Sequence, residues 1–222
     1  MKTTLFRSFV IGVCLMICGS AQALPVPITG SIDATSGGGM TATGAWGEIA
    51  PEAKLSWAVT ALTTKPGFWM YEYTFQVPEK ELSHFILETS STFTVANLSS
   101  VTGGWELGTW GTEGNSNPGM PEELYGLKFP GSNLLDGFLV VTDRAPMWGS
   151  FYAKDGRDGT DDVFAYNASF GEHSSASISG PAPYGLILVP DTKSTSIPEP
   201  GSALLLGIGF LAMAGMRKRR IS

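Results

Sequence analysis

The segment FWMYEYTFQV, residues 68–77, decides the fold class of this chain. Its residues alternate between one strongly aromatic set and one mixed set: Trp69, Tyr71, Tyr73, Phe75 and Val77 against Met70, Glu72, Thr74 and Gln76. A spacing of two places each set on its own face of an extended chain. The segment is therefore predicted to be a β-strand with its aromatic face buried.

Similar short apolar runs occur along most of the chain, at Lys54–Leu62, Leu82–Thr89, Phe93–Leu98, Trp105–Trp110, Tyr125–Phe129, Gly137–Thr142, Trp148–Lys154, Val163–Phe170 and Tyr184–Val189. Gly, Pro, Asn and Asp gather between them, notably at 111–121 and 154–162, as is typical of turns. No amphipathic helix and no fixed-period repeat is evident. The pattern predicts a single all-β domain over residues 24–190, built as a β-sandwich or jelly roll.

The N-terminal residues have the three parts of a secretory signal peptide. Lys2 and Arg7 precede an apolar run over residues 9–18, and the small residues Ala21 and Ala23 flank Gln22. We expect export through Sec-type machinery and cleavage by signal peptidase after Ala23, which makes residues 1–23 the signal peptide. Both cysteines of the chain lie in this segment, so the mature protein is predicted to contain neither disulfides nor cysteine-bound zinc.

The C-terminal residues form a second apolar run that ends in positive charge. Residues 201–216 are uncharged, and the basic residues Arg217, Lys218, Arg219 and Arg220 follow them. Such a helix would span about 24 Å, shorter than the hydrocarbon core of about 30 Å, but flanking residues can compensate for the difference. We expect a transmembrane helix at 201–216 and a cytoplasmic basic tail at 217–222, with the rest of the protein outside the inner membrane. The polar residues 191–197 then form a short stalk.

Residues 198–222 resemble the PEP-CTERM sorting signal of Gram-negative bacteria. The resemblance rests on Pro198-Glu199-Pro200, the short apolar span and the basic end, in that order. It implies recognition by an exosortase, a membrane enzyme that removes the tail and directs the protein to the cell surface or the exopolysaccharide matrix. The prolines themselves hold Glu199 in an extended segment that cannot join the following helix.

The charge of the predicted mature domain limits its partners. Residues 24–197 contain 8 basic and 19 acidic residues, a net charge of −11. Such a surface repels phosphate groups and anionic lipids, which argues against a nucleic-acid partner.

Two tryptophans are candidates for contact with carbohydrate. Trp105 and Trp110 enclose the Gly-containing segment GWELGTW beside a long loop. Exposed rings on a β-sandwich can stack on sugars, although indole rings also fill cores. For Trp57 and Trp69, which lie on alternating apolar faces, a core position is the stronger prediction.

Four aspartates could bind a cation. Within 154–162, KDGRDGTDD, they are Asp155, Asp158, Asp161 and Asp162. Clustered carboxylates suit Ca²⁺, but the spacing differs from an EF-hand loop, and Asp-Gly pairs are common in turns. A plain acidic turn is favoured, and structural Ca²⁺ is kept as a hypothesis; no other cofactor is indicated.

No catalytic arrangement is evident in the sequence. His84 lies in a predicted strand and is expected to be structural, whereas His173 lies in a polar stretch and is expected to be solvated. A nucleophile elbow, GxSxG, is missing. A glycoside hydrolase needs two carboxylates, and loop acids are available at Glu106, Glu113, Glu122 and Glu123. The sequence thus favours an exported surface or matrix protein that is not an enzyme, then a carbohydrate-binding module, then a glycoside hydrolase.

Overall fold

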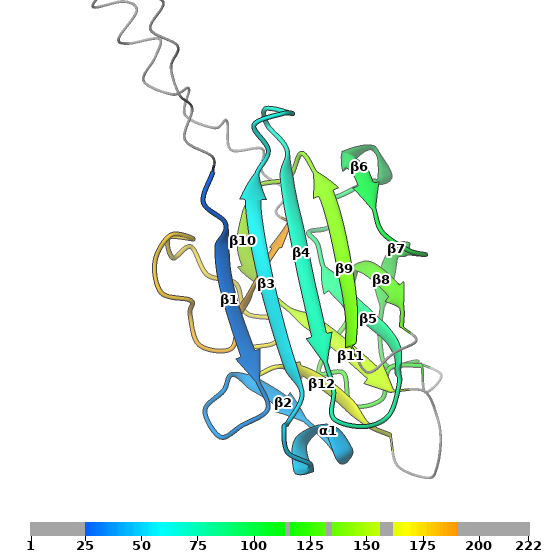
Figure 1. The fold of residues 1–222 in the computed structure, drawn as a ribbon. Coiled ribbons are helices and arrows are strands. Elements are labelled where there is room, and N and C mark those ends of the chain that lie inside the picture. The colour runs from blue at the N-terminus through cyan, green and yellow to red at the C-terminus, as the bar shows by residue number, and fades with distance from the viewer. Residues whose placement is uncertain (1–24, 114–115, 132–134, 156–161, 191–222) are drawn as a thin grey trace, which may run out of the picture.

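The computed structural model describes residues 25–113, 116–131, 135–155 and 162–190. Antiparallel sheets dominate this part of the chain, and Figure 1 shows the two large sheets as stacked layers. The only α-helix among these residues is the four-residue α1 (Ala45–Glu48). The prediction of an all-β domain is confirmed.

One layer is a five-stranded sheet whose strands lie in the order β1 (Ile28–Asp33), β3 (Lys54–Ala61), β4 (Trp69–Gln76), β9 (Leu135–Thr142) and β6 (Leu98–Val101). The other layer is a six-stranded sheet in the order β2 (Met40–Ala42), β12 (Phe164–Asn167), β11 (Phe151–Asp155), β5 (Leu82–Glu88), β8 (Leu124–Pro130) and β7 (Glu106–Trp110). A separate pair joins β10 (Pro146–Gly149) to β13 (Ile187–Pro190).

The segment that indicated the fold forms β4, in the middle of the five-stranded sheet. Tyr71, Tyr73 and Phe75 are buried to 2% exposure or less, whereas Glu72 and Thr74 between them are exposed. The alternation predicted from the sequence is confirmed, because β4 has one face on the core and the other on solvent.

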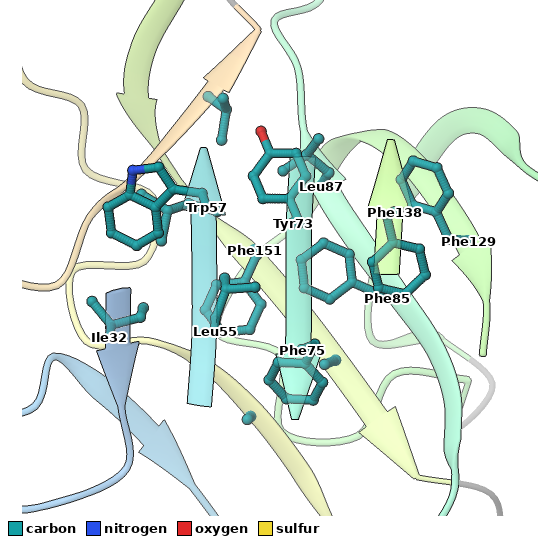
Figure 2. Packing of buried hydrophobic residues seen from close by; sticks show 14 of the residues in the cluster. Ile32, Leu55, Trp57, Tyr73, Phe75, Phe85, Leu87, Phe129, Phe138 and Phe151 are labelled. Carbon is teal, nitrogen blue, oxygen red and sulfur yellow. The ribbon is translucent and has the colours of Figure 1, made fainter. Parts of the chain in front are cut away.

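The core joins the two large sheets through aromatic rings, with Phe85 at the centre (Figure 2). The ring of Phe85 in β5 lies 5.0 Å from that of Phe138 in β9 and 5.9 Å from that of Phe75 in β4. Within its own sheet it stacks on Phe151 at 5.4 Å. Each buried ring of this size contributes roughly 1.5–3 kcal/mol, so this cluster supplies much of the stability.

Buried polar groups tie β13 and the helix to the core. The Tyr73 hydroxyl donates to the carbonyl of Leu188 in β13 at 2.8 Å, and Trp46 Nε1 of α1 donates to the carbonyl of Glu79 at 2.9 Å. All four residues of β13 are buried. The last described strand, β13, is thus an integral part of the core.

The prediction of a strand over Phe93–Leu98 is wrong. A 3₁₀ turn occupies Val95–Asn97, and β6 begins only at Leu98. The amide N–H of Thr94 donates to Asn97 Oδ1 at 2.9 Å, and Asn97 Nδ2 donates to Asp143 Oδ1 at 3.0 Å. These side-chain bonds replace the ladder that a strand would have made.

The predicted strand Trp148–Lys154 is two strands, β10 and β11, that lie in different sheets. The chain changes sheet at Ser150, which is fully buried. Its backbone N–H donates to Glu88 Oε2 at 2.6 Å, and its carbonyl accepts from the Glu88 amide at 3.1 Å. The partly buried Glu88 thus satisfies the backbone of Ser150 where the strand is interrupted.

Two strands at the N-terminal end of the domain were not predicted from the sequence. β1 contains Gly, Ser and Thr and only two apolar residues, and β2 is only three residues long. In β1 the reason for the glycine is visible, since Gly30 pairs with Trp57 of β3 and lies under its indole ring. The predicted run Val163–Phe170 contains the shorter strand β12, and β13 begins within Tyr184–Val189 and ends at Pro190.

Candidate functional site

The tryptophans divide into core and edge positions. Trp46, Trp57 and Trp148 are buried to 3% exposure or less, and Trp69 is partly buried against the core. Trp105 directly precedes β7, the edge strand of the six-stranded sheet, and Trp110 is its last residue; both are partly buried. Burial of Trp57 and packing of Trp69 agree with their predicted core positions.

A hollow of about 460 Å³ lies beside Trp105, where β5, β7 and β8 are neighbours. It is lined by Ser83, His84, Gly104, Trp105, Glu106, Lys128 and Pro130. Its volume is within the range of about 300–1,000 Å³ that small-ligand sites occupy. A partly exposed aromatic ring and several polar groups therefore converge on one surface hollow.

His84 forms one wall of this hollow and has a fixed tautomer. Asn117 Nδ2 donates to the Gly111 carbonyl at 2.7 Å, so Asn117 Oδ1 faces His84 Nε2 at 2.8 Å and must accept from it. Nδ1 is then an acceptor, 3.4 Å from the Ser83 hydroxyl. Burial, together with the charge of Lys128, lowers the pKa of His84 to about 4, so the ring is neutral at physiological pH.

Trp110 is held inside the protein more firmly than Trp105. Its Nε1 donates to the Gly126 carbonyl at 2.9 Å, and the Lys128 ammonium lies 4.7 Å from its ring centroid. The ring also packs against a small cluster that includes Ile86 and Met120. Its polar edge and one face are thus already occupied, so Trp105 is the better candidate for stacking on a ligand.

A second hollow of about 330 Å³ lies on the other side of Lys128. Two of the loop acids considered for glycoside hydrolysis, Glu113 and Glu123, line it together with Asn117. Glu106 lines the first hollow instead, and the carboxylate of Glu122 lies close to Gly171. The four acids are therefore distributed over three places in the structure.

His173 does not simply face solvent, contrary to expectation. Its Nε2 lies 2.7 Å from Glu88 Oε1, although about half of the side chain is exposed. Ser150 is close to the same glutamate, but its hydroxyl is fully buried and accepts from the Gly171 amide at 3.0 Å. Ser150, Glu88 and His173 therefore form a structural cluster in which the serine is not accessible to a substrate.

The structure describes two of the four aspartates considered for Ca²⁺. Asp162 lies 4.0 Å from Lys154 Nζ, whereas Asp155 is 1% exposed and its carboxylate oxygens accept no hydrogen bond from the described residues. Burial raises the pKa of Asp155. Asp158 and Asp161 lie outside the described residues. In the ranges that the structure covers, no three His, Cys, Asp or Glu residues are grouped as a metal site would need.

The predicted export and sorting residues lie outside the described ranges. They are Ala21 and Ala23 at the signal cleavage site, Pro198, Glu199 and Pro200 in the sorting motif, and Arg217, Lys218, Arg219 and Arg220 at the membrane stop. Among the residues that the structure describes, no helix is long and apolar enough to cross a membrane. The signal peptide and the transmembrane helix stay predictions.

The fold of the described residues is that of an all-β protein. The PEP-CTERM protein-sorting motif matches residues 196–220, so the chain carries this motif at its C-terminus. The motif implies recognition by an exosortase, and an exported protein that is anchored in the membrane and then exposed at the surface. No curated protein and no solved structure matches the chain.

Sequence reasoning identified Trp105 but missed most of its surroundings. Ser83 and Lys128 come from separate parts of the chain and meet through the pairing of β5 with β8. Asn117 lies between β7 and β8 and reaches the site through its hydrogen bond with His84. One signal was present. His84 and Lys128 are polar residues that directly precede a phenylalanine in a predicted strand, a placement that indicates a polar face or a site.

Proposed function

We propose that this protein is an exported component of the cell surface or exopolysaccharide matrix, with a structural or interaction role. The match of the sorting motif to residues 196–220 carries this proposal. Strands extend from Ile28 to Pro190, and this supports the proposal because a folded domain would remain after removal of the tail. The charge of −11 over residues 24–197 suits a soluble body that stays away from anionic membranes.

Fractionation of the native host tests this proposal. With the sorting enzyme present, we expect the domain in the surface or matrix fraction, with a C-terminus that mass spectrometry places in or near Pro198-Glu199-Pro200. Without the enzyme, we expect the intact tail and retention in the inner membrane. Recovery of the intact tail on protein in the medium would contradict the proposal, and so would a cytoplasmic domain.

We propose a role without catalysis for the same domain. The histidine and glutamate that contact each other, His173 and Glu88, adjoin a serine whose hydroxyl is buried. Their arrangement supports the fold and offers no exposed nucleophile. Incubation of the protein with polysaccharides, followed by detection of new reducing ends, tests this view, and steady release of reducing ends would overturn it.

The second candidate function is carbohydrate binding. One observation favours it, namely the hollow of about 460 Å³ in which Trp105 lies with polar side chains of both signs. Aromatic rings that combine with a few polar groups are typical of small-ligand sites. Retention of the full-length protein on immobilised polysaccharides tests it, and a lack of retention on every polysaccharide would count against it.

A further inference from the structure

We propose that the hollow beside Trp105 binds an uncharged, hydroxyl-rich sugar unit of a polysaccharide. The inference deepens the carbohydrate-binding candidate and rests on it. It adds the location of the site, the charge of the ligand and the role of each side chain.

The two charged groups of the hollow have opposite signs. Glu106 in β7 and Lys128 in β8 are cross-strand partners, and both line the hollow. Neither takes part in an ion pair with another described residue within 4.0 Å, and the Lys128 ammonium instead lies 4.7 Å from the centroid of the Trp110 ring. The hollow thus offers a donor and an acceptor and has no net charge, which suits a hydroxyl group because a hydroxyl can both donate and accept.

His84 adds an acceptor whose direction is fixed. Because the Nε2–H of His84 donates to Asn117 Oδ1 at 2.8 Å, Nδ1 carries the lone pair. Nδ1 lies 3.4 Å from the hydroxyl of Ser83, which also lines the hollow. The Ser83 hydroxyl can donate or accept. Asn117 therefore acts as a positioning residue that fixes the tautomer of the imidazole. Nδ1 is then an acceptor beside the Ser83 hydroxyl, and the two atoms form a polar edge for a sugar hydroxyl.

Trp105, Gly104 and Pro130 supply the apolar part of the hollow. Trp105 packs against the main core, which holds the ring while leaving it partly exposed. A Cβ at Gly104 would lie 3.4 Å from Pro130, an ordinary van der Waals distance, so these two residues lie side by side in the hollow. A rigid ring beside polar groups matches a pyranose, whose C–H faces are apolar and whose edge carries hydroxyls.

A charged ligand fits the hollow less well. An acidic sugar would meet Lys128 but also Glu106, and the surrounding domain has a charge of −11 over residues 24–197. A cationic sugar would be drawn to the domain but would meet Lys128 in the hollow, a contact that like charges disfavour. An uncharged unit avoids both conflicts.

The experiment is calorimetric titration of the full-length protein, purified in detergent, with neutral oligosaccharides of glucose, galactose or mannose. Oligogalacturonate and oligoglucosamine serve as the charged counterparts. We expect millimolar to micromolar binding of at least one neutral oligosaccharide that changes less than about twofold between low and high salt, because no ion pair forms. The charged oligosaccharides should bind more weakly.

Two variants locate the site. Trp105→Ala should weaken binding by about tenfold or more, the size of effect expected for a central aromatic contact. Tyr184→Ala is the matched control, since Tyr184 is 64% exposed and lies outside the hollow, and it should bind as the unaltered protein does. Because Trp105 also packs on the core, Glu106→Ala provides an exposed second change that leaves the core intact, with an expected loss of about threefold or more.

The outcomes separate the two proposals. Neutral binding that survives both Trp105→Ala and Glu106→Ala would overturn the hollow as the site and leave carbohydrate binding in place. Binding only of charged oligosaccharides, lost at high salt, would overturn the uncharged ligand. A lack of heat with every oligosaccharide would overturn this inference and the carbohydrate-binding candidate together, while the proposal of a sorted surface protein would still stand.

Discussion

The indole ring of Trp57 lies so close to Gly30, its cross-strand partner, that a Cβ at residue 30 would come within 2.2 Å of the ring. β1 is an edge strand that pairs only with β3 among the described strands. The contact between the Trp57 indole ring and the Gly30 backbone therefore helps to determine how closely β1 lies against the core.

Substitution Gly30→Ala should destabilise the domain by about 1–3 kcal/mol, because the ring must move or β1 must separate from β3. Denaturation by urea, followed through tryptophan fluorescence, measures the change. Ser31→Ala is the control in the same strand, where the side chain is exposed, and it should stay within about 0.5 kcal/mol. Equal stability of the two variants would show that the ring has room to move.

Stability should fall as pH decreases from about 6.5 to about 4, and His84 is one cause. Its pKa in the folded protein is lowered to about 4 by burial and by Lys128, from 6.5 in the unfolded chain. Between these values the unfolded chain takes up a proton that the folded protein does not, which favours unfolding by about 3 kcal/mol at the acidic end. His84→Gln should flatten this part of a profile of unfolding free energy against pH. A profile as steep as that of the unaltered protein would contradict the assignment to His84.

Asp155→Asn should stabilise the domain at neutral pH by about 1 kcal/mol, because the amide avoids the cost of a buried charge. Since burial raises the pKa of Asp155, the cost of its charge is present at neutral pH and disappears as pH falls through that pKa. The stabilisation should therefore shrink in acid. Asp162→Asn is the control, because Asp162 is more exposed and lies near Lys154. Destabilisation by Asp155→Asn would show that the carboxylate has a partner that it needs.

Calcium provides a separate test of the four aspartates in residues 154–162, of which the structure places Asp155 in β11. We expect equal midpoints of thermal unfolding with Ca²⁺ and with EDTA, since the sequence favours a plain turn over a metal site. A higher midpoint with Ca²⁺, lost in Asp155→Asn, would establish structural Ca²⁺ instead.

Glu88→Ala should cost about 2–3 kcal/mol, considerably more than His173→Ala. The first change leaves the buried Ser150 amide without its acceptor at 2.6 Å, and an unsatisfied buried donor is expensive. The second removes only a contact at 2.7 Å that is partly exposed, which is worth about 0–1 kcal/mol. Denaturation curves of both variants and of the double variant measure how much unfolding free energy each substitution costs. A larger loss for His173→Ala would reverse this account of the cluster.

Much of the fold could be predicted because a strand with one buried face has apolar residues at every second position of its sequence. β4 is the clearest case, with Tyr71, Tyr73 and Phe75 buried as expected. β1 was missed because a glycine under a tryptophan carries no apolar signal of its own. The strand predicted at Phe93–Leu98 failed because Asn97 bonds locally to Thr94, an interaction that apolar spacing does not reflect.

The candidate site was predictable only in part. Trp105 stood out as an aromatic residue in a Gly-containing segment. Its association with His84 and Lys128 depends on the order β5–β8–β7 and on their register, and the sequence contains no direct signal for either. The sorting motif could be recognised at once because its three parts are contiguous.

The position of β13 has a mechanical consequence for a tethered protein. Any pull on the chain beyond Pro190 loads this strand first, and all four of its residues are embedded in the interior. The load then passes sideways into β10 through their antiparallel pairing and into β4 through the Tyr73 hydroxyl on Leu188. Tension on the tether is thereby distributed over the middle of the two sheets. A force strong enough to detach β13 would also have to disrupt the core.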